Sequence, residues 1–275
     1  MITNLSRKKP LSVLSITSGK GGVGKTSITC NLALRFAQLG RRVLILDGDF
    51  GMANVDIFFG TRAESSFYDM IRGKKSLREI LVSPMTGIYV IPGGSGIYEM
   101  NQMNHFERRN LFDQIQEVQS HFDYLLIDTA PGIADNVLYL NAHSQICEVI
   151  LTPDPSSFAD SYALIKVLRQ KYQRKNFSLI CNQVKSHAEG LQLFRKFAEV
   201  CDQFIDVQLD FAGAIPFDEE LRLATTQQRL VLKQSTDGEA ARGLKLLAAR
   251  IEEKIMQSQQ AGSWNHFWEG AMGLA

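Results

Sequence analysis

The segment that most constrains the fold is a glycine-rich run between an apolar stretch and a helix-like stretch. Val13–Thr17 is apolar and β-branched almost throughout, as a buried strand is. Residues 19–26 follow it and read GKGGVGKT, and Lys25–Leu39 then carries apolar residues at helical spacing. Strand, glycine-rich loop and helix in this order satisfy the phosphate-loop pattern of Gly, four spacers and Gly-Lys-Thr. We therefore expect this loop to hold a nucleoside phosphate.

Each residue type in this loop has a chemical role in holding phosphate. Glycines let successive backbone N–H groups turn toward the phosphate oxygens, and the helix N-terminus adds its positive dipole. Lys25 is predicted to neutralise β- and γ-phosphate oxygens, and the Thr26 hydroxyl is predicted to hold Mg²⁺. The other nucleotide-binding residues predicted in the loop are Gly21, Gly22, Val23, Gly24 and Ser27.

The rest of the chain alternates short apolar runs with longer helical stretches, which is typical of a parallel sheet covered by helices on both faces. The predicted strands are Val13–Thr17, Val43–Asp47, Ile88–Pro92, Tyr124–Asp128, Glu148–Thr152, Ser178–Asn182 and Phe211–Ile215. The predicted helices are Lys25–Leu39, Asn104–Ser120, Ser157–Tyr172, Ala188–Gln203 and Gly238–Gln257. The predicted fold class is α/β, a doubly wound, mostly parallel sheet of a P-loop NTPase.

Two predicted strands end in carboxylates at the edge of the sheet where doubly wound proteins bind their ligands. Asp47 ends one strand and is followed by Gly48 and Asp49, and Asp128 ends another. Asp47 and Asp128 are candidates for the Mg²⁺ shell, beside Thr26. Asp49 is the candidate to orient or deprotonate the attacking water, which requires a carboxylate within hydrogen-bond reach. The alternative is that Asp47 and Asp49 only cap the strand and solvate a loop.

A further predicted strand ends at Asn182, whose amide matches both the N6 donor and the N7 acceptor of adenine. Guanine specificity would normally bring an NKxD-type segment, whereas residues 182–185 read NQVK. ATP is therefore favoured over GTP, and ATP and Mg²⁺ are the expected cofactors. The alternative for Asn182 is a structural amide that is satisfied at the end of its strand.

These motifs follow one another in the order of one known family. They read KGGVGKT, DGDFGMANVD, LLIDTAPG, LTPDPSSFADSYALIKVL, NQV and AIPFDEEL and span about residues 11–225. The chain resembles the MinD/ParA class of ATPases, which carry a deviant Walker A motif, and within it the FlhG (FleN, YlxH) branch that controls flagellar number and placement. The segment GMANVD and residues 152–166 carry the resemblance to that branch.

The resemblance implies a homodimer with ATP, a monomer without it, and slow hydrolysis of ATP to ADP and phosphate that a partner accelerates. Lys20 would reach the nucleotide of the other subunit, where a second ammonium stabilises developing charge. Asp49 would lie in the first switch, and the loop closing over the base would contain Ile215, Pro216 and Phe217. The implied partners are the flagellar GTPase FlhF, flagellar switch or C-ring proteins, or a flagellar transcription activator. Residues 1–10 lack the DQAxxLR-like motif with which members of this branch stimulate FlhF, so stimulation of FlhF is left open.

A peptide near the end of the sequence carries aromatic residues at helical spacing, so a short helix would gather them on one face. The candidate membrane or partner residues are Trp264, Phe267, Trp268 and Met272. Two weak anchors act together in a dimer. However, residues 263–275 contain no Lys or Arg, so attraction to anionic lipid is missing. A membrane anchor, packing against the protein core or a neighbour, and a disordered tail are the three alternatives.

The overall charge argues against a nucleic-acid-binding protein. Thirty Lys and Arg against 29 Asp and Glu leave a net charge of +1, although five basic residues gather within residues 166–175. A solvated helix face or a partner-docking surface is predicted there, with non-specific DNA as the alternative. The four cysteines form no CxxC pair, so neither a disulfide framework nor an Fe–S or zinc site is expected.

We expect a short basic segment at residues 1–10, a P-loop ATPase domain at residues 11–257, and a linker with an amphipathic peptide at residues 258–275. The absence of an export signal favours the cytoplasm, with peripheral contact at the inner face of the cytoplasmic membrane or at the cell pole. The predicted function is an ATP-dependent switch that regulates flagellar number, assembly or gene expression. The alternatives are a ParA-type DNA or cargo partitioning ATPase, a MinD-type division-site ATPase, and a binding module that holds ATP without turnover and sequesters a transcription activator.

Overall fold

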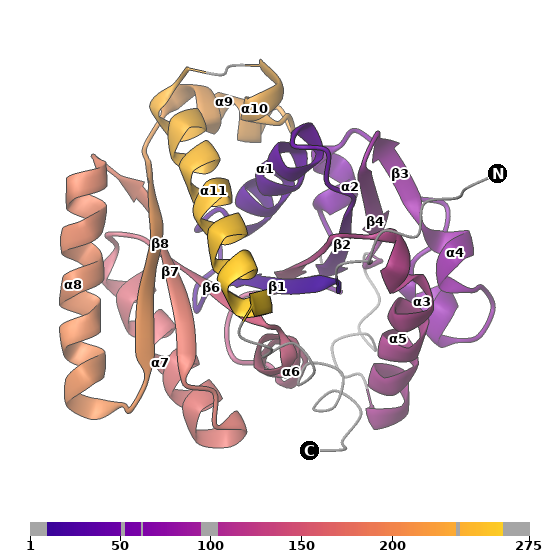
Figure 1. The fold of residues 1–275 in the computed structure, drawn as a ribbon, viewed down its shortest axis with the longest axis horizontal. Helices are drawn as coiled ribbons and strands as arrows, with labels where there is room; N and C mark the ends of the chain where they lie inside the picture. The colour runs from indigo at the N-terminus through magenta and orange to yellow at the C-terminus, as the bar shows by residue number, and fades with distance from the viewer. Residues whose placement is uncertain (1–9, 51–52, 62, 95–103, 235–236, 261–275) are drawn as a thin grey trace.

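The computed structural model of the 275-residue chain describes residues 10–50, 53–61, 63–94, 104–234 and 237–260 (Figure 1). Its centre is an eight-stranded sheet in the order β3-β4-β2-β5-β1-β6-β7-β8. All neighbours pair in parallel except β3 and β4, which pair antiparallel. The strands are β1 (Ser12–Thr17), β2 (Val43–Gly48), β3 (Val82–Met85), β4 (Ile88–Ile91), β5 (Tyr124–Thr129), β6 (Ile146–Leu151), β7 (Asn176–Val184) and β8 (Gln208–Pro216).

The four central strands are buried along their whole length because helices cover both faces of the sheet. The helices are α1 (Lys25–Gln38), α2 (Val55–Phe58), α3 (Phe67–Ile71), α4 (Leu77–Ile80), α5 (His105–Val118), η2 (Gln119–His121), α6 (Asp135–His143), α7 (Pro155–Tyr172), α8 (His187–Phe204), α9 (Glu219–Thr226), α10 (Val231–Gln234) and α11 (Glu239–Gln260). This arrangement confirms the predicted doubly wound α/β class.

Alternate side chains along each strand point to opposite faces of the sheet and pack into separate hydrophobic cores. On one face, α1 and α11 pack over Ile45, Leu126 and Ile150. On the other face, α5 covers Leu44 and neighbouring residues, while α7 and α8 cover Val149 and its neighbours. Figure 1 shows α11 running along the sheet beside α1, with α5, α6 and α7 beyond the opposite face. The phosphate loop between β1 and α1 therefore starts from a rigid centre.

The sequence prediction missed several elements. Strand β3 was not predicted, since it contains Pro84 and is an edge strand that pairs only with β4. Helix α6 was also missed, because it buries Asn136 and Asn141 along with its apolar residues and so lacks a clean apolar stripe. The short helices α2, α3, α4, α9 and α10 were not assigned either.

The end of the domain also differs from the prediction. Helix α11 continues to Gln260, so residues 258–260, which were predicted to begin a linker, are helical. Ser and Gln carry no strong helix-breaking tendency, and neither Gly nor Pro occurs between Leu244 and Gln260. The four aromatic and methionine candidates of the terminal peptide lie outside the described residues, as do residues 1–9.

Candidate functional site

The phosphate loop is held in a conformation that its glycines alone permit. Gly22 and Gly24 have φ of 76° and 97°, in the left-handed region that side chains disfavour. Gly19 packs so closely on α7 that a Cβ atom there would lie 2.1 Å from the carbonyl carbon of Asp160. Gly24 is also the N-cap of α1 and provides no side-chain hydrogen bond to the first N–H groups of the helix. Those donors consequently point into the loop, as in an anion-binding helix N-terminus.

Lys25 and Thr26 open α1 beside the carboxylate of Asp128. The Thr26 hydroxyl donates to Asp128 Oδ2 at 2.6 Å, and the Thr29 hydroxyl donates to Asp128 Oδ1 at 3.2 Å. Lys25 is only 8% exposed. Burial lowers its pKa, whereas the carboxylates of Asp128 and Asp49 act in the opposite direction. The three residues predicted at the centre of the site, one from β5 and two from α1, thus lie together.

Asp47 and Asp128, both predicted for the Mg²⁺ shell, are direct neighbours across β2 and β5. Both are buried, with exposed fractions of 1% and 2%. Burial raises the pKa of Asp128 to about 6, although the hydroxyl of Thr26 and the charge of Lys25 oppose the rise. Burial and the neighbouring charge of Asp128 also raise the pKa of Asp47. Two adjacent buried carboxylates of this kind are stabilised by a cation.

The backbone after β2 is arranged around the side chain of Asp47. Asp47 Oδ2 accepts the N–H groups of Asn54 at 2.9 Å and of Val55 at 3.0 Å, and Oδ1 accepts the N–H of Asp49 at 3.3 Å. Asp47 therefore shapes the loop that presents Asp49, a role that the sequence did not indicate. Asp49 itself is half-buried and close enough to influence the pKa values of Lys25 and Asp128.

Lys20 contacts its own chain at the start of α7. Its Nζ donates to Asp154 Oδ2 and to Ser156 Oγ, both at 2.5 Å. This hydrogen bond from Lys20 lowers the pKa of Asp154 to about 2, aided by the N–H and hydroxyl of Ser156. Asp154 also caps α7. The sequence prediction missed Asp154 and Ser156 as partners of Lys20; Asp before Pro is a helix-start signal that indicates Asp154 as an N-cap, but it does not indicate a contact with Lys20.

A cavity of about 190 Å³ lies beside the phosphate loop, where an adenine base is expected. Its lining brings together the predicted residues Gly22, Gly24, Ser27, Asn182, Pro216 and Phe217. Ile215, also predicted, is fully buried in the core and does not line the cavity. Helix α9 adds residues that the sequence prediction did not include, among them Arg222 and Thr225, whose hydroxyl lies 3.1 Å from Ser27 Oγ.

Asn182 contacts the loop directly. Its Nδ2 donates to the backbone oxygen of Val23 at 2.7 Å, and the residue is 4% exposed. The amide therefore ties β7 to the phosphate loop in this structure. This contact corresponds to the structural alternative stated for Asn182, while its place in the cavity lining leaves its carboxamide beside the expected base.

The basic residues of 166–175 are largely committed to contacts within the chain. Arg169 and Lys175 pair with Asp206, and Lys171 pairs with Asp135. Arg174 donates to the backbone oxygens of Asn141, Ala142 and Ser144 at the end of α6. Five basic residues here face two carboxylates, Asp206 and Asp135, so their positive charge is compensated only in part, while the contacts of Arg169, Lys171, Arg174 and Lys175 hold these side chains against their own chain.

Comparison with known proteins identifies the family. The family model ParA, described as NUBPL iron-transfer P-loop NTPase, matches residues 10–252. The antiactivator FleN of Pseudomonas aeruginosa is 35% identical over 94% of this chain and 93% of its own length. The flagellum site-determining protein YlxH of Helicobacter pylori is 31% identical over 88% of this chain and 82% of its own length.

A solved structure shows the same fold. The septum site-determining protein MinD of Pyrococcus horikoshii, complexed with Mg-ADP, superposes with a TM-score of 0.71 at 23% identity. The superposition covers 89% of this chain and 97% of that one.

The fold and the phosphate loop define a P-loop NTPase. The chain belongs to the ParA/MinD family of these proteins, in the branch that holds FleN and YlxH. This confirms the interpretation made from the sequence motifs.

Three further observations concern iron transfer, metal binding and membrane crossing. The iron-transfer description of the family model has no counterpart among the cysteines, since Cys30, Cys147, Cys181 and Cys201 are all buried and free. Within the described ranges, no group of three or more His, Cys, Asp or Glu is placed to hold a metal ion by itself. No helix in that part of the chain combines the length and apolar character needed to cross a membrane.

Proposed function

We propose that this protein is an ATP-hydrolysing switch that regulates flagellar number or placement by binding partner proteins when it holds ATP. Its similarity to FleN and YlxH over most of the chain is the observation that supports the flagellar role. Nucleotide hydrolysis is supported by four residues that lie together beside the phosphate loop, namely Lys25, Thr26, Asp47 and Asp128. Arg169 and Lys171 of α7 pair with carboxylates of the same chain, which reduces the positive charge that the DNA-partitioning alternative needs.

The residues present fit ATP and Mg²⁺. Glycines at positive φ and the open first turn of α1 suit phosphate, and the cavity beside Asn182 suits a base. Mg²⁺ prefers oxygen ligands and is usually held by one or two carboxylates together with substrate phosphates, so a protein-only metal cage is not needed. Thr26 is assigned as its direct ligand, and Asp47 and Asp128 as acceptors for its waters. Held by these residues, Mg²⁺ would supply positive charge that neutralises the charge developing on the phosphate oxygens.

The side chains of the site then have separate tasks. Lys25 is buried and holds its ammonium toward the phosphates, where it compensates charge that grows during transfer. Asp49, on the loop shaped by Asp47, orients the attacking water and accepts its proton. Lys20 acts on the nucleotide of a second subunit in the ATP-bound homodimer, so it must first leave Asp154 and Ser156.

The partners that this proposal assigns are FlhF, a flagellar switch or C-ring protein, or a flagellar transcription activator. The decisive experiment combines phosphate release by the purified protein with flagellar counts by electron microscopy of cells carrying Lys25→Ala. We expect loss of phosphate release and an altered number of flagella per cell. A normal number of flagella in cells whose variant has lost hydrolysis would support the ATPase activity but contradict the flagellar role. Full hydrolysis by the variant would contradict the role assigned to Lys25 in the active site.

A further inference from the structure

Another buried carboxylate lies outside the phosphate-loop site, in the first half of β6. Glu148 of β6 is 1% exposed, and neither of its carboxylate oxygens has a hydrogen-bond partner among the described residues. Glu148 is paired in register with Ser178 of β7, and Ser178 is paired with Asp210 of β8. The sheet therefore presents a polar row, Glu148-Ser178-Asp210, to the helix that covers it.

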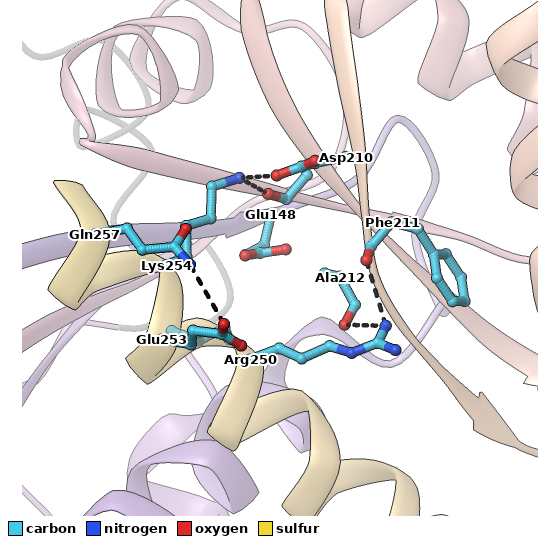
Figure 2. A pocket seen from close by; sticks show the side chains of 10 residues that line it. Glu148, Asp210, Phe211, Ala212, Arg250, Glu253, Lys254 and Gln257 are labelled. Carbon is cyan, nitrogen blue, oxygen red and sulfur yellow. Dashed lines mark hydrogen bonds and ion pairs between the residues drawn. The ribbon is translucent and has the colours of Figure 1, made fainter.

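Helix α11 covers this row and supplies two cations, but neither bonds to Glu148 (Figure 2). Lys254 Nζ donates to Ser178 Oγ at 2.5 Å and to Asp210 Oδ2 at 2.7 Å. Arg250 Nη1 points to the backbone oxygens of Phe211 and Ala212, at 3.4 and 3.3 Å. The nearby positive charges are thus directed to other acceptors, and a buried carboxylate without a hydrogen bond is energetically unfavourable.

The carboxylate points into a cavity of about 270 Å³ between the sheet and α11. The charged groups that line this cavity are Glu148, Asp210, Glu253, Arg250 and Lys254. Burial raises the pKa of Glu148 to about 7, with Lys254 opposing the rise and Asp210 adding to it. Three carboxylates against two cations leave the cavity with an excess of negative charge when Glu148 is ionised.

We propose that this cavity binds a small aliphatic amine, whose ammonium group donates hydrogen bonds to Glu148. An ammonium supplies up to three N–H donors and a full positive charge, which are what the buried carboxylate lacks. The alkyl chain would lie against Ile251 and Ala212, which also line the cavity. A cavity of about 270 Å³ is slightly smaller than typical ligand pockets, which suits a small ligand. It is much roomier than a single coordinated metal ion requires.

The test is calorimetric titration of the full chain with putrescine at pH 8, where the diamine is protonated. We expect saturable binding that Glu148→Gln weakens at least roughly tenfold, since the amide removes the negative charge but keeps the shape. Lys254→Met removes a competing cation and should tighten binding several-fold, which keeps the proposal testable should Glu148→Gln fold poorly. Glu117→Gln, at an exposed carboxylate of α5, is the matched control and should leave affinity unchanged.

Two further titrations distinguish amine binding at Glu148 from amine binding elsewhere on the protein. Lowering the pH from 8 to 6 should weaken putrescine binding about tenfold, because Glu148 then carries a proton. Lys25→Ala should bind the amine as the unmodified protein does, because the phosphate loop takes no part. Equal affinity of Glu148→Gln and the unmodified protein, or the same heat with Na⁺ or Mg²⁺ in place of putrescine, would overturn the proposal.

Discussion

The two ends of the parallel strands bury carboxylates in different ways. At the carboxyl end, Asp47 accepts three backbone N–H groups and Asp128 accepts two hydroxyls. Near the amino ends, Glu148 is equally buried but accepts no hydrogen bond from the described part of the chain. The carboxylates of the phosphate-loop site are thus oriented in advance by their own chain, as a catalytic site requires. Glu148 is not oriented by any hydrogen bond within the described residues, so both of its oxygens can accept hydrogen bonds from a ligand.

The largest expected effect concerns ATP hydrolysis at the phosphate-loop site, at the carboxyl ends of the strands. Lys25→Ala or Asp49→Ala should lower phosphate release at saturating ATP about 100-fold or more, because each removes a group that acts on developing charge or on the attacking water. Steady-state phosphate release measures this, with circular dichroism to check folding. Asp56→Asn, a carboxylate in the first turn of α2, is the control and should retain activity. If Asp49→Ala retained most of the activity, a residue other than Asp49 would orient the attacking water.

The next effect concerns stability at the same end. Asp47→Ala should lower the free energy of unfolding by about 3 kcal/mol, because the N–H groups of Asp49, Asn54 and Val55 lose their acceptor together. Asp128→Ala should cost less, since its partners Thr26 and Thr29 carry hydroxyls that can rotate to other acceptors. Urea denaturation of both variants measures the difference. Equal losses would mean that Asp47 does not organise the loop.

The sequence predicted the carboxyl end of the sheet better than the amino end, for a physical reason. The phosphate loop directly follows a strand, and Asp47 and Asp128 lie at the carboxyl ends of theirs, so local patterns place all three at one edge. Glu148, Ser178 and Asp210 are about 30 residues apart in sequence, and only the register of β6, β7 and β8 makes them neighbours. No local pattern carries that information.

Smaller failures have the same origin. Strand β3 carries Pro84 and forms because β4 offers it a partner, which is tertiary context rather than propensity. Asp154 and Ser156 meet Lys20 because the start of α7 lies against the phosphate loop, although 134 positions separate Lys20 from Asp154. Side-chain pairings over such distances follow from the packing of whole elements.

A third prediction tests whether the negative charge of Glu148 destabilises the folded protein because no group of the chain compensates it. Glu148→Gln should raise the free energy of unfolding by about 2 kcal/mol at pH 8, because burial penalises the ionised form. The pKa of Glu148 is raised on folding to about 7, so the native protein binds the proton more tightly and loses stability as the pH rises from about 4.5 to 7. The advantage of the variant should therefore shrink to under about 1 kcal/mol at pH 5.

Chemical denaturation at the two pH values measures this difference. Asp210→Asn is the comparison variant, since the Asp210 side chain is 67% exposed and already bonded to Lys254, so the change should be small or destabilising. If Glu148→Gln were less stable than the unmodified protein at pH 8, the charge of Glu148 would be compensated within the chain. Glu148 would then not differ from Asp47 and Asp128 in this respect.

The smallest expected effect decides between the two interpretations of Asn182. Loss of the Nδ2 bond to the Val23 oxygen should weaken nucleotide binding about fivefold in Asn182→Ala, or about 1 kcal/mol. If the amide only anchors the loop, ATP and GTP should lose affinity equally, because the loop contacts phosphates common to both. If it also reads adenine, the loss should fall on ATP alone and the preference for ATP over GTP should narrow. Competition binding with the two nucleotides separates the two interpretations. Ser27→Ala, at a residue of the same cavity whose hydroxyl contacts Thr225, controls for a general loosening of the pocket.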